Sequence, residues 1–323
     1  MRRASEVVDV WFDSGSMPFA QWHYPFENRD LFEAMFPADF ICEGIDQSRG
    51  WFYSLLAIAT LVEGRAPFKT VMANELILDE IGRKMSKRLG NAVDPWEVLG
   101  AEGADALRWY LLTNSPPWVT TRFSREGVTE VARKFFGTLR NVAAFFASYA
   151  NVDGWTPGAA APPLAERPLI DRWLLSRLDA VSASMREDLA NYQMTRAGRT
   201  LSAFVQDELS NWYVRRNRRR FWKGERGPDK DAAYATLHEA LAVVARLLAP
   251  FAPFLAETLH RALVVPYDPE APVSVHLASY PAPGDERRNL ALDAAVARAL
   301  PATERARAAR TQAGLKVRQP LSR

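Results

Sequence analysis

Residues 79–95 read DEIGRKMSKRLGNAVDP and carry two lysines, Lys84 and Lys87, on a glycine-bounded loop. Asp94-Pro95, at the end of this stretch, is typical of a helix start, because proline suits the first helical position. A loop between a strand and a helix that bears two mobile cations can close on a triphosphate and offset charge on a leaving pyrophosphate. Two lysines on a loop are more often solvated surface charges, so the loop alone leaves both interpretations open.

The segment before this loop mixes strand-like and helical runs. We expect a buried strand over residues 39–42 that runs into Glu43-Gly44, a helix over residues 49–63, and further strand character over residues 68–78. Strands that alternate with helices are typical of a parallel α/β sheet. The sequence therefore predicts an α/β domain over residues 1–115.

Beyond the loop the apolar pattern changes to helical spacing. Over residues 128–149, apolar side chains recur at steps of three and four, which marks one face of a long helix. Residues 151–163 are rich in glycine, proline and alanine and are the best linker candidate. We predict a helical connecting segment with its linker over residues 116–163 and an all-helical bundle over residues 164–323.

Composition sets broad limits on the class of protein. The 323 residues are 48% apolar, which is enough for two or more packed domains. Cys42 is the single cysteine, which excludes an internal disulfide framework and a cysteine-cluster zinc site. No apolar run approaches the roughly 20 residues that cross a bilayer, and the N-terminus lacks the apolar segment of a signal peptide. We expect a soluble cytoplasmic protein, with no membrane contact and no dedicated metal site.

Positive charge is concentrated in one part of the helical half. The net charge is only +3, yet residues 215–226 hold seven basic residues against the single acid Glu225. The overlapping stretch at residues 210–222 reads SNWYVRRNRRRFW. Aromatics interleaved with arginines on a helix can follow phosphates while stacking on unpaired bases. The other interpretation packs the tryptophans inward and leaves the arginines as a solvated face, and the pattern alone does not decide.

Three motifs resemble one known family. KMSKR at residues 84–88 is similar to the KMSKS signature of the class I aminoacyl-tRNA synthetases, with Arg88 in place of the final serine. DVWFDSGSMPF at residues 9–19 and EGIDQSRGWF at residues 43–52 resemble the isoleucyl branch of that family. The resemblance implies the C-terminal half of a Rossmann-like nucleotide-binding catalytic domain, followed by an α-helical bundle anticodon-binding domain.

The resemblance also implies roles for individual residues near the loop and at the end of the predicted strand. The lysines implied to be catalytic are Lys84 and Lys87. The residues implied to bind ATP or the aminoacyl-adenylate are Glu43, Gly44, Asp46, Gln47 and Lys87. Carboxylates suit the ribose because they accept hydrogen bonds from vicinal hydroxyls.

Two further groups of residues gain an implied role. Trp11 and Trp51 would wall the pocket for the isoleucine side chain, where flat apolar surfaces exclude water. The stretch around Arg215, Arg216 and Arg219 is similar to the anticodon-binding helical domain of the family, which makes tRNA contact the favoured interpretation of these arginines.

The implied reaction is the ATP-dependent activation of isoleucine to isoleucyl-adenylate and its transfer to tRNA(Ile), with Mg²⁺ accompanying ATP. A class I active site also needs a His-x-Gly-His signature, and none of the four histidines stands in that context. We therefore expect a partial chain, truncated at both ends and inactive alone, with a missing N-terminal half in trans as a candidate partner. The alternative is a stand-alone tRNA-binding module without catalysis. The intact Glu43, Asp46, Gln47 and lysine loop favour the enzyme.

Overall fold

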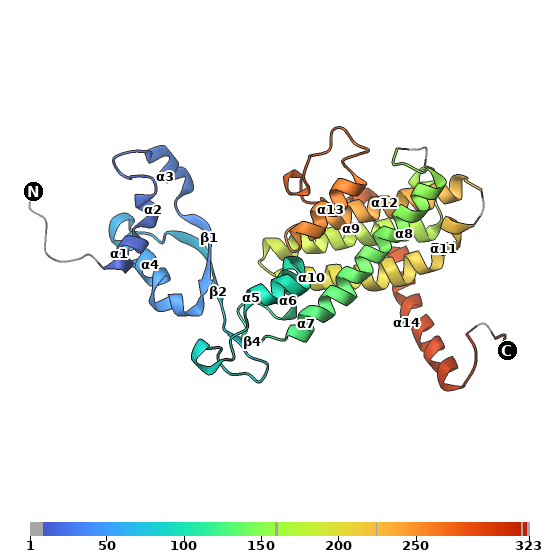
Figure 1. The fold of residues 1–323 in the computed structure, drawn as a ribbon. Helices are drawn as coiled ribbons and strands as arrows, with labels where there is room; N and C mark the ends of the chain where they lie inside the picture. The colour runs from blue at the N-terminus through green and yellow to red at the C-terminus, as the bar shows by residue number, and fades with distance from the viewer. Residues whose placement is uncertain (1–8, 159–160, 224, 318, 322–323) are drawn as a thin grey trace, which may run out of the picture. The chain divides into compact units, whose positions relative to one another are not determined.

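The computed structural model describes residues 9–158, 161–223, 225–317 and 319–321 (Figure 1). The chain divides into two compact units, each described by itself. Unit 1 comprises Met1–Asp94 and Asn114–Ser124, and unit 2 comprises Pro95–Thr113 and Arg125–Arg323. The three-segment division given by the sequence pattern stays a prediction.

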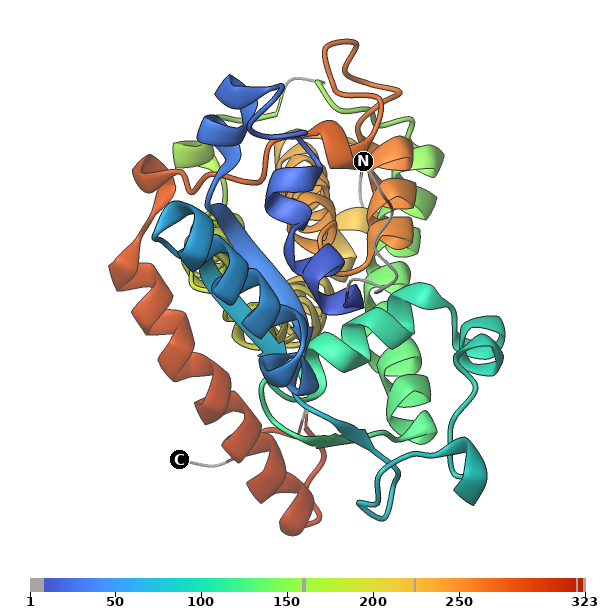
Figure 2. The ribbon, with the colours of Figure 1, turned by 90° about the vertical axis from the view of Figure 1, so that its left-hand side faces the viewer.

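Unit 1 is built on a β–α–β arrangement. Strand β1 (Ala38–Gly44) runs parallel to strand β2 (Phe68–Asn74), with Ala38 opposite Phe68 and Gly44 opposite Asn74. Helix α4 (Trp51–Glu63) connects the two strands, and Figure 2 shows it running alongside them. Two parallel strands need such a crossover. The predicted strand, helix and parallel pairing are confirmed.

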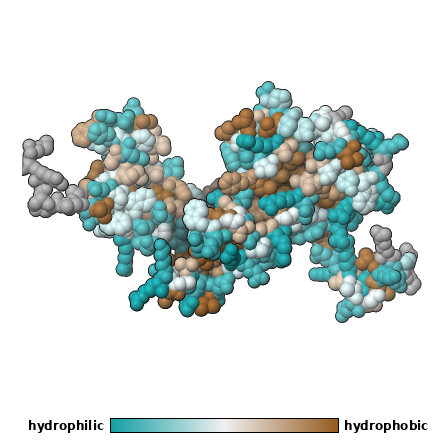
Figure 3. Space-filling view, viewed as in Figure 1, coloured by the Kyte–Doolittle hydropathy of each residue, from teal (hydrophilic) through white to brown (hydrophobic). Residues whose placement is uncertain are grey.

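The prediction that β1 is a buried strand is wrong for this chain. Its residues are half-buried or exposed, and Phe40 is 40% exposed. Within the described residues this sheet has only two strands, so most of its surface lacks a covering layer. Figure 3 shows hydrophobic residues, in brown, among hydrophilic ones over the surface of unit 1.

Short helices complete unit 1 around a small aromatic core. Helices α1 (Val10–Gly15), α2 (Met17–Ala20) and α3 (Arg29–Met35) precede β1. One buried cluster consists of Phe19, Phe32, Phe36 and Ala59. The Phe32 ring lies 5.5 Å from that of Phe19 and 4.8 Å from that of Phe36, between ring centroids. This core links the chain before β1 to α4.

The lysine loop also belongs to unit 1. Strand β3 (Ile77–Leu78) precedes the loop and pairs in parallel with β4 (Thr121–Arg122). The loop contains one short 3₁₀ helix, η2 (Lys87–Leu89). A loop between strand and helix, as the sequence predicts, is confirmed, since helix α5 begins at Pro95.

In unit 2, every regular element among the described residues is a helix, which confirms the predicted all-helical bundle. The α-helices are α5 (Pro95–Glu102), α6 (Ala104–Asn114), α7 (Arg125–Val131), α8 (Gly137–Asp153), α9 (Leu169–Ala190), α10 (Met194–Ala203), α11 (Arg215–Trp222), α12 (Pro228–Leu248), α13 (Pro253–Leu263) and α14 (Leu290–Gln312). The short 3₁₀ helices are η4 (Leu164–Glu166), η6 (Val275–Leu277) and η7 (Asp285–Arg287).

Two segments of unit 2 are π-helical, a geometry the sequence did not predict. They are η3 (Ala132–Phe136) and η5 (Phe204–Val214), and each runs without a break into the following α-helix. The expected long helical face over residues 128–149 is therefore present but contains a π-helical turn. Such turns are rare and occur often at functional sites.

The core of unit 2 lies between α8, α9 and α12, which Figure 1 shows side by side. Buried apolar residues recur at the helical spacing that the sequence predicts; they include Val128, Leu139, Val142, Phe146, Leu174, Leu178, Val181, Met185, Leu237, Leu241 and Val244. Within the segment expected to be a linker, residues 159–160 lie outside the described residues. Before them, the Tyr234 hydroxyl donates to Asp153 at 2.5 Å, and the Trp155 and Tyr234 rings stack with centroids 5.4 Å apart.

None of the helices in the described part of the chain combines the length and the apolar character required to cross a membrane.

Candidate adenylate site and candidate RNA interface

The carboxyl end of β1 gathers four of the predicted site residues. Glu43 and Gly44 end the strand, and Asp46 and Gln47 follow in the 3₁₀ helix η1 (Ile45–Arg49). Glu43 and Asp46 are exposed to solvent, and the Glu43 side chain has no hydrogen-bond partner among the described residues. Ligands of open α/β sheets bind beyond the carboxyl ends of the strands. This edge therefore offers two exposed carboxylates where such a ligand would lie.

Gly44 lies close to the neighbouring carboxylate of Asp46. A Cβ atom at this position would lie 2.6 Å from Oδ1 of Asp46. A side chain at position 44 would therefore displace the Asp46 carboxylate from this place. The glycine in the EGID sequence leaves room for the second carboxylate over the end of the strand.

Gln47 is held by the start of α4. Its Oε1 accepts a hydrogen bond of 3.0 Å from the main-chain N–H of Trp51, the first residue of α4. Gly50, at the N-cap position, has no side chain to satisfy this helix end, so the Gln47 carboxamide takes over the role. Its Nε2 lies 3.4 Å from Oδ2 of Asp46. Gln47 therefore connects the second carboxylate to the helix.

The two predicted pocket tryptophans lie beside Gly50. A Cβ atom on Gly50 would lie 3.0 Å from the Trp11 ring, so this ring packs directly on the glycine backbone. The indole Nε1 of Trp51 donates to the carbonyl oxygen of Ser14 at 3.1 Å, which ties α4 to α1. Trp11 is 46% exposed, whereas Trp51 is half-buried. The structure thus brings together two tryptophans that are forty positions apart.

Helices α1 and α4 approach each other through a second glycine. A Cβ atom on Gly15 would lie 2.9 Å from backbone and side-chain carbons of Ser54. At the other end of α1, the Asp9 carboxylate accepts from the N–H of Trp11 at 2.7 Å and caps the helix. Trp51 also lines a small apolar cavity of about 50 Å³ with Met17, Trp22, Ile41, Leu55 and Phe68.

In the lysine loop the main chain is tied down and the lysine side chains are free. Lys84 and Lys87 are exposed, as is Arg88, and none of the three side chains makes a hydrogen bond or ion pair with another described residue. The loop backbone is held by Asp79 and Asn91, which lie at its two ends. The arrangement leaves three cations available to an anionic ligand.

Asp79 is 9% exposed and fully engaged in this loop. Its carboxylate accepts from Asn91 Nδ2 at 2.9 Å, from the Arg83 N–H at 2.7 Å and from Arg83 Nε at 3.0 Å. These contacts, with the Asn91 hydrogen bond first, lower the pKa of Asp79 to about 2. The Arg83 guanidinium is thereby neutralised and does not join the free cations of the loop.

The basic stretch of unit 2 lies on α11 and presents most of its arginines outward. Arg215, Arg216 and Arg219 are exposed, which both the RNA-contact and the solvated-face interpretations allow. The Arg216 guanidinium stands 4.5 Å over the Trp212 ring, a cation–π contact. Arg215 also lines an open groove of about 320 Å³ between α8 and the η5–α11 junction, together with Asn141, Phe145, Ser210, Asn211 and Arg218.

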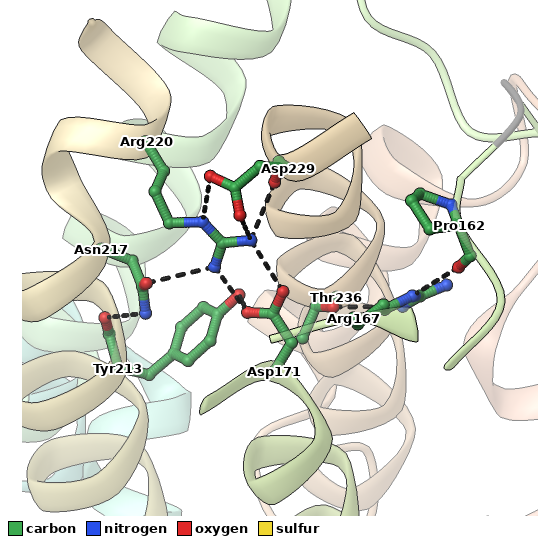
Figure 4. A network of polar contacts seen from close by, with 8 residues as sticks. All are labelled: Pro162, Arg167, Asp171, Tyr213, Asn217, Arg220, Asp229 and Thr236. Atoms are coloured by element: carbon green, nitrogen blue, oxygen red, sulfur yellow. Dashed lines mark hydrogen bonds and ion pairs between the residues drawn. The ribbon is translucent and has the colours of Figure 1, made fainter. Parts of the chain in front are cut away.

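Arg220 is the exception within this stretch, because its side chain points into the bundle (Figure 4). Its Nη1 and Nη2 donate to the two carboxylate oxygens of Asp171 at 2.7 and 2.8 Å. Its Nε donates to Asp229 at 3.0 Å, and its Nη1 also lies 3.1 Å from Oδ1 of Asn217. Asp171 is completely buried and accepts a further hydrogen bond from Tyr213 at 2.8 Å.

The network sets the electrostatics of its members. Burial lowers the pKa of Arg220, but the hydrogen bonds and charge of Asp171 outweigh burial and raise it. Burial and the neighbouring Asp171 charge raise the pKa of Tyr213. Both groups therefore keep fixed protonation states at neutral pH. Sequence reasoning missed this network, although Tyr213, Asn217 and Arg220 recur at steps of four and three, the spacing of an inward helix face.

Among the described residues, no group of three or more His, Cys, Asp or Glu side chains is placed to hold a metal ion.

Comparison with known proteins identifies the family. Residues 1–124 match the family model of the class I tRNA synthetases (I, L, M and V). Residues 171–323 match the model of the anticodon-binding domain of tRNA ligases. The chain belongs to the class I tRNA synthetases.

Curated relatives of this class I chain are isoleucine–tRNA ligases. The chain is 51% identical over 324 residues to that of Porphyromonas gingivalis, covering 100% of this chain and 28% of the relative. It is 51% identical over 322 residues to that of Thermus thermophilus, covering 99% of this chain and 31% of the relative. The chain thus spans less than a third of the length of these relatives.

Solved class I synthetases share the fold. A LeuRS–tRNA–LeuAMS ternary complex from Agrobacterium radiobacter K84 matches with a TM-score of 0.68 at 20% identity, covering 89% of this chain and 34% of that one. Methionyl-tRNA synthetase of Mycobacterium tuberculosis, in complex with methionyl-adenylate, matches with a TM-score of 0.65 at 22% identity, over 83% of this chain and 56% of that one. The predicted family, and a partial catalytic domain followed by an anticodon-binding domain, are confirmed.

Proposed function

We propose that this chain is the part of an isoleucine–tRNA ligase that holds the adenylate and the pyrophosphate and contacts the tRNA. The observation that carries the proposal is the lysine loop, where Lys84 and Lys87 are solvent-exposed and unpaired on a fixed backbone. The identity of about half to isoleucine–tRNA ligases supports isoleucine as the amino acid. A module that only binds RNA has no need for free carboxylates at the end of β1.

The chemistry assigned to the site is adenylate formation. The isoleucine carboxylate attacks the α-phosphorus of ATP in line, and the bond to pyrophosphate breaks. The ammonium groups of Lys84 and Lys87 offset the charge that accumulates on the leaving pyrophosphate. Positioning and electrostatics carry most of the catalysis in such a phosphoryl reaction. Mg²⁺ would accompany the phosphates of ATP, since the described residues offer no cluster of their own for it.

The remaining site residues bind and orient the adenylate. Glu43 and Asp46 accept hydrogen bonds from the ribose hydroxyls, and Gly44 permits close approach of the ligand to the strand end. Gln47 lies on the aminoacyl side, where its Nε2 still has donor capacity. Trp11 and Trp51 wall the pocket for the isoleucine side chain and exclude water from it.

The second half of the proposal is tRNA(Ile) binding by unit 2, in the cytoplasm where translation takes place. Exposed Arg215, Arg216 and Arg219 supply phosphate contacts, and the Trp212–Arg216 pair offers a stacking surface for an unpaired base. The aminoacyl group would then pass from the adenylate to the terminal ribose of the bound tRNA.

Pyrophosphate exchange tests the catalytic half. The 323-residue chain alone should not exchange pyrophosphate into ATP with isoleucine, because its sequence lacks the histidine signature. A longer chain that supplies this signature, covalently or as a second polypeptide in trans, should do so, with isoleucine and not with leucine or methionine. Exchange that is absent in the longer chain would leave the stand-alone tRNA-binding module as the better interpretation.

Salt-dependent binding tests the tRNA half. Affinity for tRNA(Ile) should fall with added salt by a log–log slope of roughly −0.7 to −0.9 per phosphate contact, because counterions are released. Replacing Arg215, Arg216 and Arg219 by alanine together should weaken binding and flatten this slope. Arg226→Ala is the matched control, since Arg226 already pairs with Asp231 at 3.1 Å. If the triple variant binds tRNA with the same affinity and salt dependence as the parent chain, the three arginines are only a solvated helix face.

A further inference from the structure

We propose that Asp79 and Asn91 are positioning residues that hold the lysine loop in one backbone shape while its cations stay free. The two side chains lie twelve positions apart, at the two ends of the loop, and meet through the 2.9 Å hydrogen bond from Asn91 Nδ2 to Asp79 Oδ2. This inference rests on the proposed function, because it assigns the pair a task for the lysines.

Asn91 is connected to three points of the loop. Besides its bond to Asp79, its Nδ2 lies 3.2 Å from the carbonyl oxygen of Lys84, and its Oδ1 accepts from the N–H of Ser86 at 2.9 Å. The carboxamide therefore spans Lys84 to Ser86 on the main chain. Since it uses both its donor and its acceptor, no other uncharged side chain except glutamine could make the same set of bonds.

Asp79 holds the other end of the loop, next to strand β3. It binds the N–H of Arg83 through one oxygen and the Arg83 guanidinium and Asn91 through the other. The main chain adds two bonds within this turn, from Asp79 N–H to the Arg83 carbonyl at 2.9 Å and from Gly82 N–H to the Asp79 carbonyl at 3.0 Å. The turn before the lysines is thus held at Asp79, Gly82 and Arg83.

Two further features complete the shape of the loop. The Ser86 hydroxyl accepts from the Arg88 N–H at 3.2 Å and caps η2. Gly82 and Gly90 have φ angles of 86° and 65°, values that glycine adopts without strain. Apart from Arg83, which pairs with Asp79, the side chains that hold the loop backbone are uncharged or negative.

The exposed basic side chains of the loop are therefore different residues from those that hold its backbone. Of the four basic residues in GRKMSKR, Arg83 is neutralised by Asp79, while Lys84, Lys87 and Arg88 have no partner among the described residues. A preorganised set of donors stabilises charge without the cost of reorganising at the moment of reaction. Loosening the backbone should therefore affect the lysines together, although neither Asp79 nor Asn91 needs to touch the ligand.

Limited trypsin digestion of the 323-residue chain tests directly whether the Asp79 and Asn91 hydrogen bonds hold the loop backbone. Trypsin cleaves after lysine and arginine where the backbone is free to adapt to the protease. Asn91→Ala should raise the cleavage rate after Lys84, Lys87 and Arg88 by about tenfold or more, read by mass spectrometry, since local opening controls such cleavage. Cleavage after Lys69, on β2 of the same unit, should stay unchanged. Asn91→Asp, which loses both donor bonds and brings a second carboxylate next to Asp79, should have the same effect.

The controls decide between a positioning role and general support of the fold. Asn74→Ala removes a half-buried amide of the same unit, whose Nδ2 lies 3.2 Å from the Cys42 sulfur, and should leave loop cleavage unchanged. Unchanged cleavage of the loop in both Asn91 variants would overturn the proposal. Faster cleavage at Lys69 in proportion to the loop would also overturn it, because the pair would then support the whole unit.

A kinetic measurement separates this inference from the proposed function. In a longer chain with isoleucine-dependent exchange, Asn91→Ala should lower kcat by about tenfold or more and leave the KM for isoleucine unchanged, as expected for lost transition-state contacts. If Lys87→Ala leaves the exchange rate intact, the assigned chemistry fails. If Lys87→Ala is slow and Asn91→Ala is as fast as the parent, only the positioning role fails.

Discussion

The lysine loop of unit 1 and the arginine stretch of unit 2 are both basic runs in sequence, yet the structure uses their charges differently. In the loop, Asp79 pairs with Arg83 and leaves the lysines free. In the helix, Asp171 pairs with Arg220 and leaves the neighbouring arginines free. In each run one basic residue is paired with acids, Arg83 with Asp79 and Arg220 with Asp171 and Asp229, while others stay exposed. The number of basic residues in a stretch therefore does not tell which of them can meet a ligand.

The two acids differ in how far their contacts reach. Asp79 bonds only within residues 79–91, so it holds one loop. Asp171, on α9, bonds to Tyr213 and Arg220 from η5 and α11, and Arg220 in turn reaches Asp229 on α12 (Figure 4). The hydrogen bonds of Asp79 can break without loss of the fold, because they lie within one loop. The Asp171 network joins four helical segments, so its loss should destabilise the fold. Substitutions of Asp171 and of Asn91 test the two sides of this contrast.

Asp171→Ala should produce the largest effect on stability. It leaves the Arg220 guanidinium, whose side chain is only 14% exposed, without its bidentate partner. Breaking one half of a buried ion pair typically costs about 3–5 kcal/mol. Urea unfolding followed by far-ultraviolet circular dichroism measures the change. Asp229→Ala is the control, since the Asp229 side chain is 63% exposed and exposed pairs contribute about 1 kcal/mol or less. Equal losses in the two variants would contradict the contrast.

Lys87→Ala should affect the chemical step in a chain that also carries the histidine signature. Because the lysine is assigned to charge that develops in the transition state, its loss should slow adenylate formation by about a hundred- to a thousandfold, or roughly 3–4 kcal/mol. Isoleucine affinity should change little, whereas Glu43→Ala should instead weaken the adenylate complex. Pre-steady-state adenylate formation is the measurement. Lys69→Ala, which removes an exposed lysine paired with Asp39, is the control and should react at the parental rate.

Local features of the fold could be predicted from the sequence. The β1 strand, the α4 crossover and the helix start at Pro95 follow from short-range apolar patterns and proline geometry, and all three are present. The helical spacing of unit 2 predicts its buried face over most of α8, α9 and α12. The motifs around the lysine loop identify the family without reference to the structure.

Features that depend on distant partners could not be predicted in the same way. The expectation of a buried β1 failed because burial depends on covering layers, which no strand pattern specifies. The inward turn of Arg220 requires Asp171, which is 49 positions earlier in the chain. The hydrogen bond between Asn91 and Asp79 joins residues twelve positions apart. From the sequence alone, an acid and an amide on a loop cannot be distinguished from ordinary solvated residues.

Gly15→Ala should have a moderate effect and tests whether α1 is fixed by its contact with α4. The added Cβ would lie 2.9 Å from Ser54 atoms, so the helices must separate. Overpacking of this kind typically costs about 1–3 kcal/mol. Because Trp11 lies on α1, its fluorescence should also change. Gly100→Ala is the matched control, since nothing lies within 4 Å of its Cβ position in α5. A Gly15 variant as stable as the Gly100 variant would show that α1 is free to shift.

The smallest effect concerns acid pH, where one carboxylate of each unit can be compared. The hydrogen bonds from Asn91 and from the Arg83 N–H lower the pKa of Asp79 to about 2. Burial raises the pKa of Glu257 on α13, but hydrogen bonds from the Val275 N–H and Arg261 outweigh it and bring this pKa also to about 2. A carboxylate with a lowered pKa in the folded state stabilises the fold above its unfolded pKa, near pH 4. That contribution disappears as the pH falls through about 2.

Carbon-detected NMR titration of the two carboxyl groups should therefore give midpoints near 2 for both residues in the parent chain. Asn91→Ala should raise the midpoint of Asp79, since it removes the hydrogen bond that contributes most to the lowered pKa, and should leave Glu257 unchanged. Arg261→Ala should do the reverse, because the guanidinium donates to the Glu257 carboxylate at 2.6 Å. If Asn91→Ala leaves the Asp79 midpoint in place, the Arg83 bonds alone hold the carboxylate. Asn91 would then contribute to the loop only through its bonds to Lys84 and Ser86.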